Sequence, residues 1–279
     1  MQKNPAGTCD CHIHFYGPED QYPVAPTSPF PPPDAPVGKY REVMKSLGID
    51  RVVVVQPSAY GKDNRCTVDA ITELGPCARG IAVVDMDTPD AELQSLTAAG
   101  IRGVRFHMLP GGVLPWEILE DVAARVHDFG WHVQLQLDGR DLPQYEDVLH
   151  RLPGALVIDH TGKFLEPVSI DHPGFQTLLR LIDSGRVWIK LSAPYETSNV
   201  GAPSYDDVGV LAKALIAAAP ERMVWATNWP HPSVQDNPPD EAILMGALLE
   251  WMGDEETRHQ ILVDNPATLY GFNETIGRG

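Results

Sequence analysis

Val52-Val53-Val54-Val55, followed directly by Gln56-Pro57-Ser58, is the stretch that decides the fold class of this chain. Four β-branched residues in a row are typical of a strand that is buried on both faces, and such strands occur in parallel sheets covered by helices. The polar residues after the run predict that the strand ends at one edge of the sheet. A parallel sheet needs further strands of this kind, each joined to the next by a helix.

The rest of the chain supplies them, because short apolar runs alternate with stretches of helical periodicity. Strands are predicted at 10–15, 52–55, 78–84, 104–107, 133–138, 156–160, 187–192 and 223–228. Helices are predicted at 40–47, 67–74, 90–99, 116–129, 142–152, 172–184, 205–219, 240–252 and 255–263. Strands that alternate with helices pair in parallel, and right-handed crossovers close eight such units into a barrel. We therefore predict an α/β fold, a (β/α)₈ TIM barrel, with residues 1–279 in a single domain.

An open, doubly wound sheet is the alternative arrangement of alternating strands and helices. It normally carries a glycine-rich phosphate-binding turn after an early strand. Neither a G-x-G-x-x-G sequence nor a P-loop occurs in this chain. The barrel therefore remains the prediction, and it places the functional side chains at the C-terminal ends of the strands.

The composition narrows the classes of function. The 279 residues carry a formal net charge of −17, which argues against nucleic acid and anionic membranes as partners. No apolar run is long enough to span a bilayer, and no signal peptide is evident. Four cysteines lack the spacing of a zinc finger or ribbon, and we interpret them as reduced thiols of a cytoplasmic protein: Cys9, Cys11, Cys66 and Cys77.

Residues 17–37 are rich in proline, with Pro-Phe-Pro-Pro-Pro at 29–33. Such a density of missing N–H donors excludes a helix or a central strand. A flexible linker is one interpretation of this segment. Apolar side chains in and beside it favour instead an ordered loop that covers the site after the first strand: Phe15, Tyr16, Tyr22 and Phe30.

Asp10-Cys11-His12-Ile13-His14-Phe15 is the predicted first strand, in which polar and apolar residues alternate. His12 and His14 then point to one side of the strand, and Cys9 and Cys11 point to the other. Two neighbouring imidazoles suit a divalent metal, or they can polarise one substrate oxygen. In a parallel barrel they meet the polar residues at the ends of the other strands: Gln56, Ser58, Asp85, Arg105, His107, Gln136, Asp138, Asp159, His160, Lys190, Ser192, Asn228 and His231.

Two further histidines are distinguished by their positions. His160 follows the apolar run at 156–158 and should face the histidine pair; alternatively, it only caps the barrel by hydrogen bonding. His231 lies between two prolines, which fix its backbone as a positioned ligand or acid requires, although a turn residue is the alternative. The histidines on or beside predicted helices are expected at the surface: His127, His132, His150, His172 and His259.

Arg105 lies inside an otherwise apolar strand. Burying a guanidinium without a partner is costly, so it needs a carboxylate, either from a substrate or from Asp85 or Asp138. Lys163 and Lys190 add further cations near the predicted mouth of the barrel. Two tyrosines are candidate hydrogen-bond donors to a substrate, with packing as the alternative role: Tyr60 and Tyr195.

Several of these motifs, taken together and in this order, resemble the amidohydrolase superfamily. The resemblance covers nearly the whole chain and points to the amidohydrolase-related branch that contains 2-pyrone-4,6-dicarboxylate lactonase and galactarolactone isomerase. The motifs are Asp10-x-His12-x-His14, Gln56-Pro57-Ser58 with Asp63-Asn64, Gly103-Val104-Arg105, Ile158-Asp159-His160-x-Gly162-Lys163, Trp225-x-Thr227-Asn228-Trp229-Pro230-His231 and Asn265-Pro266-x-x-Leu269-Tyr270.

The resemblance implies a distorted (β/α)₈ barrel that acts on a cyclic ester. It implies that His12, His14 and His160 surround the ester carbonyl. Arg105 matches an arginine that holds a substrate carboxylate. Asn228 stands where most of the superfamily has the aspartate that activates water. An amide cannot accept a proton near neutral pH, so Asn228 can orient an attacking oxygen without deprotonating it.

We therefore expect a hydrolase that opens the ester of a small polar, carboxylated lactone, with catalytic residues His12, His14, His160, Asn228 and His231. A lactone isomerase of the galactarolactone isomerase type is the alternative, in which a substrate hydroxyl replaces water. A sugar-acid-binding protein without catalysis is the third hypothesis. The expected substrate-binding residues are Ser58, Tyr60, Arg105, His107, Gln136, Lys163 and Tyr195.

The two-metal site of the superfamily is incomplete in this sequence, because the fourth and fifth strands end without the lysine and histidine that such a site uses. Either no cofactor is required, or a single divalent metal such as zinc binds His12, His14 and His160. The expected partner is a small-molecule lactone, and whether the chain forms a homo-oligomer stays open.

Overall fold

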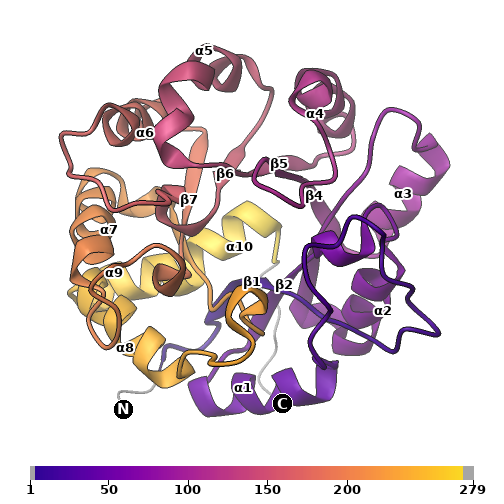
Figure 1. Ribbon diagram of the computed structural model, residues 1–279, viewed down its shortest axis with the longest axis horizontal. Helices are drawn as coiled ribbons and strands as arrows, with labels where there is room; N and C mark the ends of the chain where they lie inside the picture. Colours follow the sequence, from indigo (N-terminus) through magenta and orange to yellow (C-terminus); the bar gives the residue numbers. More distant parts are fainter. Residues whose placement is uncertain (1–3, 273–279) are drawn as a thin grey trace.

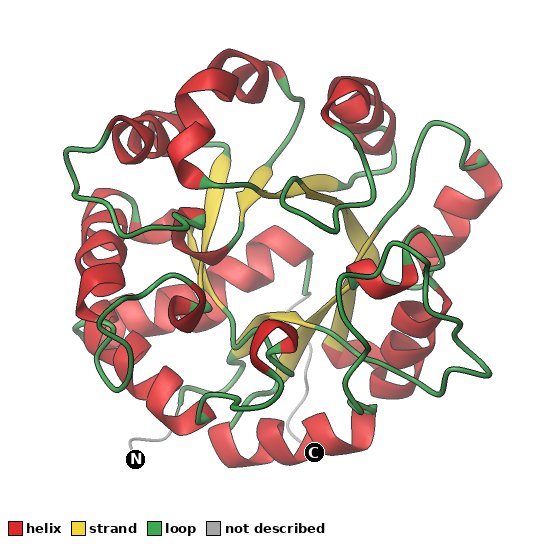
Figure 2. Ribbon diagram, in the orientation of Figure 1, coloured by secondary structure: helices red, strands yellow, loops and turns green. Residues whose placement is uncertain are grey.

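The computed structural model describes residues 4–272, which contain one sheet of eight parallel strands (Figure 1). Each strand pairs with the next one in the chain. Helices surround the ring of strands (Figure 2), which confirms the predicted single-domain (β/α)₈ barrel. The strands are β1 (Cys9–Ile13), β2 (Arg51–Val55), β3 (Ala78–Ala82), β4 (Ile101–His107), β5 (His132–Gln136), β6 (Leu156–Ile158), β7 (Val187–Leu191) and β8 (Met223–Trp225).

The helices follow the predicted alternation and differ from it mainly at their ends. The α4 helix begins at Leu119 because residues 116–118 form a separate 3₁₀ turn after Pro115. None of the helices in the described part of the chain is long and apolar enough to cross a membrane. The helices are α1 (Val37–Leu47), α2 (Arg65–Leu74), α3 (Asp90–Ala98), α4 (Leu119–His127), α5 (Leu142–Arg151), α6 (Pro173–Asp183), α7 (Asp206–Ala218), α8 (Glu241–Met252), α9 (Glu255–His259) and α10 (Asn265–Tyr270).

The α10 helix closes the N-terminal end of the barrel, and the sequence pattern does not predict it. The pattern at 255–263 predicts one helix, but α9 ends at His259 and a π-helical turn leads into α10. In Figure 1, α10 crosses behind the ring of strands. Tyr270 of α10 packs against inward-facing residues near the beginnings of the strands: Cys9, Val53, Val157, Trp188 and Val224.

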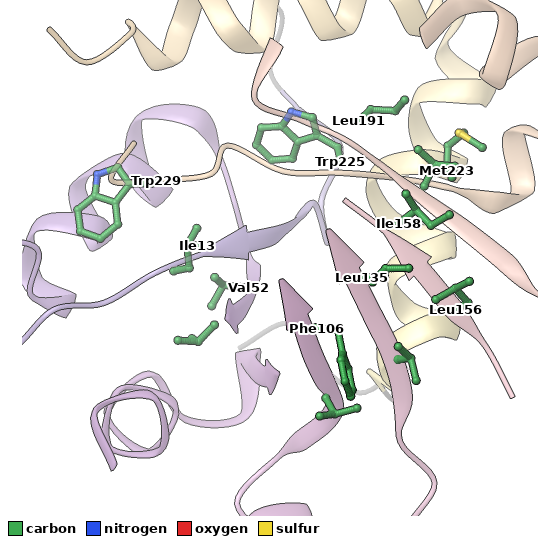
Figure 3. Packing of buried hydrophobic residues seen from close by; sticks show 14 of the residues in the cluster. Ile13, Val52, Phe106, Leu135, Leu156, Ile158, Leu191, Met223, Trp225 and Trp229 are labelled. Carbon is green, nitrogen blue, oxygen red and sulfur yellow. The ribbon is translucent and has the colours of Figure 1, made fainter. Parts of the chain in front are cut away.

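The other alternate residues of each strand pack against the surrounding helices. Successive side chains of a strand point to opposite faces of the sheet. One set packs inside the barrel and the other packs against the helices, so the strands are buried on both faces, as the run Val52–Val55 predicts. Figure 3 shows part of the outer layer. Its members are fully or almost fully buried: Ile13, Val52, Phe106, Leu135, Leu156, Ile158, Leu191, Met223 and Trp225.

The prediction that the cysteines and histidines of the first strand face opposite sides is wrong for Cys11 and His12. The register of β1 against β2 shifts between Asp10 and Ile13. Such an irregularity breaks the strict alternation of side chains. Cys11 therefore belongs to the inward-facing cluster together with Cys9, and His12 also points inward, where it approaches residues of other strands.

His132 is not at the surface, as its place beside a predicted helix suggests, but is the first residue of β5. It is buried, and its ring meets the ring of Tyr270 edge-on with the centroids 5.5 Å apart. Burial lowers the pKa of His132 to about 3, so the imidazole is neutral near neutral pH. It forms part of the closed end of the barrel.

The barrel closes where the chain beyond β8 meets β1. The N–H of Asn228 donates to the carbonyl oxygen of His12 at 3.0 Å, and the N–H of His14 donates to the carbonyl oxygen of Trp229 at 2.8 Å. These main-chain bonds fix Asn228 beside the histidine pair. The segment after β8 and the end of β1 thus place two predicted parts of the site, Asn228 and the histidine pair, side by side.

Asp10 supports this closure with its carboxylate. One oxygen accepts hydrogen bonds from the main-chain N–H groups of Thr227 at 3.0 Å and His12 at 3.2 Å. The other accepts from the Thr227 hydroxyl at 2.5 Å and the Tyr40 hydroxyl at 2.8 Å. Burial raises the pKa of Asp10 to about 6 despite these bonds, so the carboxylate is charged at neutral pH and joins β1, α1 and the segment after β8.

We expect Asp10→Asn to lower the free energy of unfolding by about 1–3 kcal/mol, because the new amide presents N–H groups to donors that then lack an acceptor. Chemical denaturation measures the change. Asp87→Asn, at an exposed position, is the matched control and should change stability little. Equal effects of the two substitutions would contradict the role given to Asp10.

Candidate active site

A cavity of about 310 Å³ opens at the C-terminal ends of the strands. Pro29 and Phe30 of the proline-rich segment form part of its wall, next to Tyr16. Residues from most of the strand ends converge on it, as the barrel geometry requires. Eight of the predicted site residues line this cavity: His14, Ser58, Arg105, His107, Gln136, His160, Lys163 and Asn228.

The remaining four predicted residues do not line the cavity. His12 lies beside His14, deeper in the barrel and fully buried. Tyr195 and His231 lie behind Asn228, to which the Tyr195 hydroxyl is bonded. Tyr60 packs in an aromatic group with Tyr16 and Tyr22, and its hydroxyl accepts a bond from the N–H of Gly17.

Other residues of the cavity wall escape prediction from sequence. Glu196 and Ser233 are its additional polar groups, and Leu109, Pro110, Leu165 and Pro232 are apolar ones. Glu196 directly follows Tyr195, which is the one signal that could have singled it out. The loop residues carry no periodic pattern, so only the three-dimensional structure brings them to the site.

His12 and His14 form a directed hydrogen-bonded pair. Their Nε2 atoms are 3.2 Å apart, and Nδ1 of His14 lies 2.8 Å from the carbonyl oxygen of Val55. A carbonyl oxygen only accepts, so Nδ1 of His14 carries its proton and Nε2 of neutral His14 is an acceptor. The N–H at Nε2 of His12 must therefore donate to His14, which leaves Nδ1 of His12 without a proton.

A buried lysine completes this arrangement beneath the pair. Lys190 of β7 is fully buried, and its ammonium donates to Oε1 of Gln134 at 2.6 Å. It also lies 3.3 Å from Nδ1 of His12 and 3.4 Å from Oδ1 of Asp159. Gln134 in turn donates to Oδ2 of Asp159 at 3.0 Å. The unprotonated Nδ1 of His12 thus faces the Lys190 ammonium as a donor, which agrees with the tautomer derived above, and the same ammonium lies against both this nitrogen and Oδ1 of Asp159, which are 3.4 Å apart.

The site histidines are neutral near neutral pH. Burial, together with the Arg105 cation, lowers the pKa of His14 to about 3. Burial also holds the pKa values of His12 and His160 well below their ordinary range. Burial alone would raise the pKa of Asp159, but Lys190 and other nearby cations hold it below its usual value. The interior therefore pairs a carboxylate with an ammonium among neutral imidazoles.

His160 is the imidazole that is free to act on a ligand. Its Nδ1 lies 2.8 Å from the Ser192 hydroxyl, which can donate to it and leave an N–H at Nε2. The backbone of His160 is left-handed, with φ of 54°, and Asn228 has φ of 64°. Residues other than glycine rarely adopt this conformation, and such strain concentrates at functional sites. The ring of His160 lies 4.9 Å from that of His12.

Arg105 offers a cation without a carboxylate partner among the described residues. Its Nη1 donates to the carbonyl oxygen of Gln56 at 2.9 Å, and its Nη2 donates to Oε1 of Gln136 at 3.1 Å. Its Nε is buried without a bond to residues 4–272. The two candidate protein partners pair elsewhere, Asp85 with Lys62 and Asp138 with Arg140. The cavity is thus suited to an anionic group beside Arg105.

Lys163 and Glu196 form an ion pair in the cavity wall. Burial lowers the pKa of Lys163 to about 8. The other oxygen of Glu196 accepts a bond from the Ser233 hydroxyl at 2.6 Å. An ammonium whose pKa lies this close to neutrality can hold an anion and can also give up a proton.

Three of the described residues offer ligand atoms close enough together to hold a metal ion: His12, Asp159 and His160, all within 4.8 Å of one another. His14, which the sequence suggests as a ligand, is not one of these three. Two nitrogens and one carboxylate oxygen are a donor set that zinc accepts. The Lys190 ammonium already lies against two of the three residues, so an ion there would have a second cation as its neighbour.

Comparisons with known proteins identify the family of this chain. The family model described as amidohydrolase matches residues 9–272. The chain is 40% identical over 270 residues to D-galactarolactone isomerase of Agrobacterium fabrum, an alignment that covers 95% of this chain and 91% of the relative. It is 36% identical over 278 residues to 2-pyrone-4,6-dicarboxylate hydrolase of Comamonas testosteroni, covering 96% and 91%.

A solved structure has the same fold. The crystal structure of an apo protein from Agrobacterium tumefaciens superposes with a TM-score of 0.91 at 39% identity and covers 97% of both chains. The resemblance seen in the strand-end motifs is therefore confirmed. The chain belongs to the amidohydrolase family.

Proposed function

We propose that the protein opens the ester of a small polar lactone that carries at least one carboxylate, using water as the nucleophile. The single observation that carries this proposal is the buried Arg105, which faces a cavity of about 310 Å³ without a carboxylate partner among residues 4–272. Relatives that act on lactones support the reaction class: an isomerase of galactarolactone and a hydrolase of 2-pyrone-4,6-dicarboxylate.

Cations of the cavity bind the substrate in this proposal. Arg105 holds a carboxylate through charge-assisted hydrogen bonds, which are the strong ones in a dry pocket. Lys163 lies on the same cavity, and His107 and Gln136 line the wall near Arg105. Burial lowers the pKa of His107 to about 4, so His107 contributes a neutral polar group.

In this proposal the histidines beside the cavity polarise the ester carbonyl. With the Ser192 hydroxyl donating to Nδ1, His160 carries an N–H at Nε2 that bonds to none of residues 4–272, so we assign it the donor to the carbonyl oxygen and to the oxyanion that forms. His12 and His14 hold each other in fixed tautomers beside it. The Lys190 charge below them adds a positive field where negative charge develops, and the low dielectric of the interior strengthens that field.

The nucleophile is oriented by Asn228, which lines the cavity. Because an amide is no base, Asn228 positions an attacking hydroxyl without taking its proton. This observation favours a second candidate function, lactone isomerisation, in which a hydroxyl of the substrate itself attacks the ester and the ring migrates. The same groups serve both reactions, and only the source of the attacking oxygen differs.

Lys163 is placed to complete either reaction. When the ester bond breaks, the Lys163 ammonium, with a pKa of about 8, donates a proton to the leaving alkoxide, and the proton released by the attacking oxygen returns the resulting amine to its charged form. A divalent ion, if one binds, would be held by His12, Asp159 and His160 and would polarise the same carbonyl.

All four cysteines are free thiols, which supports our proposal of a reducing compartment such as the cytoplasm.

Turnover of carboxylated lactones in water enriched with ¹⁸O tests the proposed function. We expect the lactone ring to be lost and one labelled oxygen to enter the product carboxylate, followed by NMR and mass spectrometry. Ring migration without label would establish isomerisation instead. Thermal stabilisation by the lactones without any turnover would contradict both reactions and favour a binding protein.

We expect Arg105→Gln to raise KM for a carboxylated lactone about 30- to 150-fold with a smaller change in kcat, since a hydrogen bond to a charged group contributes about 2–3 kcal/mol. Steady-state kinetics measures this. Arg102→Gln on the same strand is the matched control, because Arg102 bonds to main-chain oxygens of Thr97 and Ile101 and lies off the cavity. A lactone without a carboxylate should bind equally well to both variants; if its KM rises as much, Arg105 is not the anion site.

We expect kcat/KM to fall as the pH rises through about 8, because Lys163 loses the charge and the proton that the reaction uses. The pH profile of the wild-type protein measures this basic limb. Lys163→Arg keeps a positive charge at high pH, so in this variant the limb should move to higher pH even if the maximum is lower. An unchanged limb in Lys163→Arg would assign it to another group.

A further inference from the structure

A chain of hydrogen bonds runs from Asn228 in the cavity wall to Glu241 at the beginning of α8. The Nδ2 of Asn228 donates to the Tyr195 hydroxyl oxygen at 2.8 Å. The Tyr195 oxygen lies 2.9 Å from Nδ1 of His231. The Nε2 of His231 lies 2.7 Å from Oε1 of Glu241. None of Tyr195, His231 and Glu241 lines the first cavity.

The direction of every bond in this chain follows from its last member. When His231 carries a single ring proton, the Glu241 carboxylate, which only accepts, places that proton at Nε2, and Nδ1 of His231 then accepts. The Tyr195 hydroxyl must then donate to His231, and burial raises the pKa of Tyr195, so this proton stays on the oxygen. The Tyr195 oxygen is left to accept, and only the NH₂ end of Asn228 can donate to it.

The orientation of the Asn228 amide is therefore not free. Its backbone is fixed by the bond of its N–H to the carbonyl oxygen of His12 and by that of the His231 N–H to its own carbonyl oxygen. The remaining freedom is the exchange of Oδ1 and Nδ2 by rotation of the amide. With Nδ2 turned to Tyr195, Oδ1 is the polar atom left to face the cavity.

We propose that Glu241 is a positioning residue which, through His231 and Tyr195, holds Asn228 with its oxygen toward the substrate as a hydrogen-bond acceptor. This inference rests on the proposed function for its consequence: an acceptor aligns the O–H of an attacking water or hydroxyl, whereas an NH₂ group in its place would repel that hydrogen. The specificity of the site for a hydroxyl nucleophile thus depends on a carboxylate outside the cavity.

Glu241 also borders a second cavity of about 350 Å³, which it lines together with His231, Lys39 and Asp34. The side chain of Glu241 is 18% exposed. Its Oε2 is buried without a hydrogen bond to the described residues, so the carboxylate is held to the chain through Oε1. The charge of Glu241 is therefore directed at His231.

A series of substitutions at Glu241 separates the orientation effect from a structural one. A glutamate carboxylate only accepts hydrogen bonds, a glutamine amide accepts or donates them, and a lysine ammonium only donates them. We expect Glu241→Gln to make the two amide orientations about equal and to lower kcat about twofold. Glu241→Lys should reverse the chain and lower kcat more than tenfold, with KM for the lactone within about twofold in both, because the anion site is unchanged.

The same series in an Asn228→Asp background is the decisive control. A carboxylate has two acceptor oxygens and no NH₂ group to turn, so its orientation cannot be reversed. The Glu241 substitutions should then change kcat by less than about twofold. Equal losses in both backgrounds, or a rise in KM that accounts for the loss, would overturn the inference. Glu250→Gln, exposed on the same helix and paired with Lys213, is the matched control for α8.

An NMR measurement tests the inference independently of turnover. With side-chain amides labelled, the NH₂ protons of Asn228 should show cross-relaxation to the ring protons of Tyr195 in the wild-type protein and lose it in Glu241→Lys. If the wild-type protein shows this contact and turns over no lactone, the proposed function fails and the orientation device stands. Contacts that are the same in both proteins would refute it. Tyr195→Phe, which cuts the chain in its middle, serves if Glu241→Lys does not fold.

Discussion

The buried ammonium of Lys190 is the constraint on which the interior of this barrel depends. Removing an ammonium from water costs several kcal/mol, and this cost is recovered only when acceptors surround it. Gln134, Asp159 and His12 supply these acceptors from β5, the end of β6 and β1. Four strand segments must therefore keep their relative register, since a shift of one residue would leave a charge unpaired. His12, one of these groups, lies against His14 and His160, which line the cavity, so the requirement for stability also fixes the site.

The Lys190 ammonium determines which neighbouring groups donate and which accept hydrogen bonds, and this order extends to the residues of the cavity. Lys190 can only donate, and the carbonyl oxygen of Val55 can only accept, so the tautomers of His12 and His14 between them have one consistent solution. On the other side of the cavity Glu241 imposes a direction in the same way, as an obligate acceptor. The polar groups that line the cavity are thereby oriented in the free protein, which is the condition under which polar groups stabilise a transition state at little reorganisation cost.

The sequence could predict the parts of this structure that depend on local periodicity. The apolar run at 52–55, repeated between helical stretches, predicts the barrel, and polar strand ends predict most of the cavity wall. It could not predict that Cys11 and His12 both face inward, because the irregularity of β1 is visible only in its pairing with β2. Nor could it find Glu241, whose contact with His231 is made across a loop without periodic pattern. What local sequence does not contain is the geometry of loops and the direction of hydrogen bonds.

The acidic character of the whole chain and the cationic character of the cavity are compatible because they act over different distances. The net charge of −17 repels an anionic substrate at long range, but at physiological ionic strength exposed charges are screened beyond about 8 Å. Inside the cavity Arg105 and Lys163 are buried and screened much less. The repulsion therefore acts mainly on the approach of the substrate, while its retention depends on the local cations. Arg105 lines the cavity and has no carboxylate partner among residues 4–272, so a carboxylate that binds there supplies the partner that folding leaves missing.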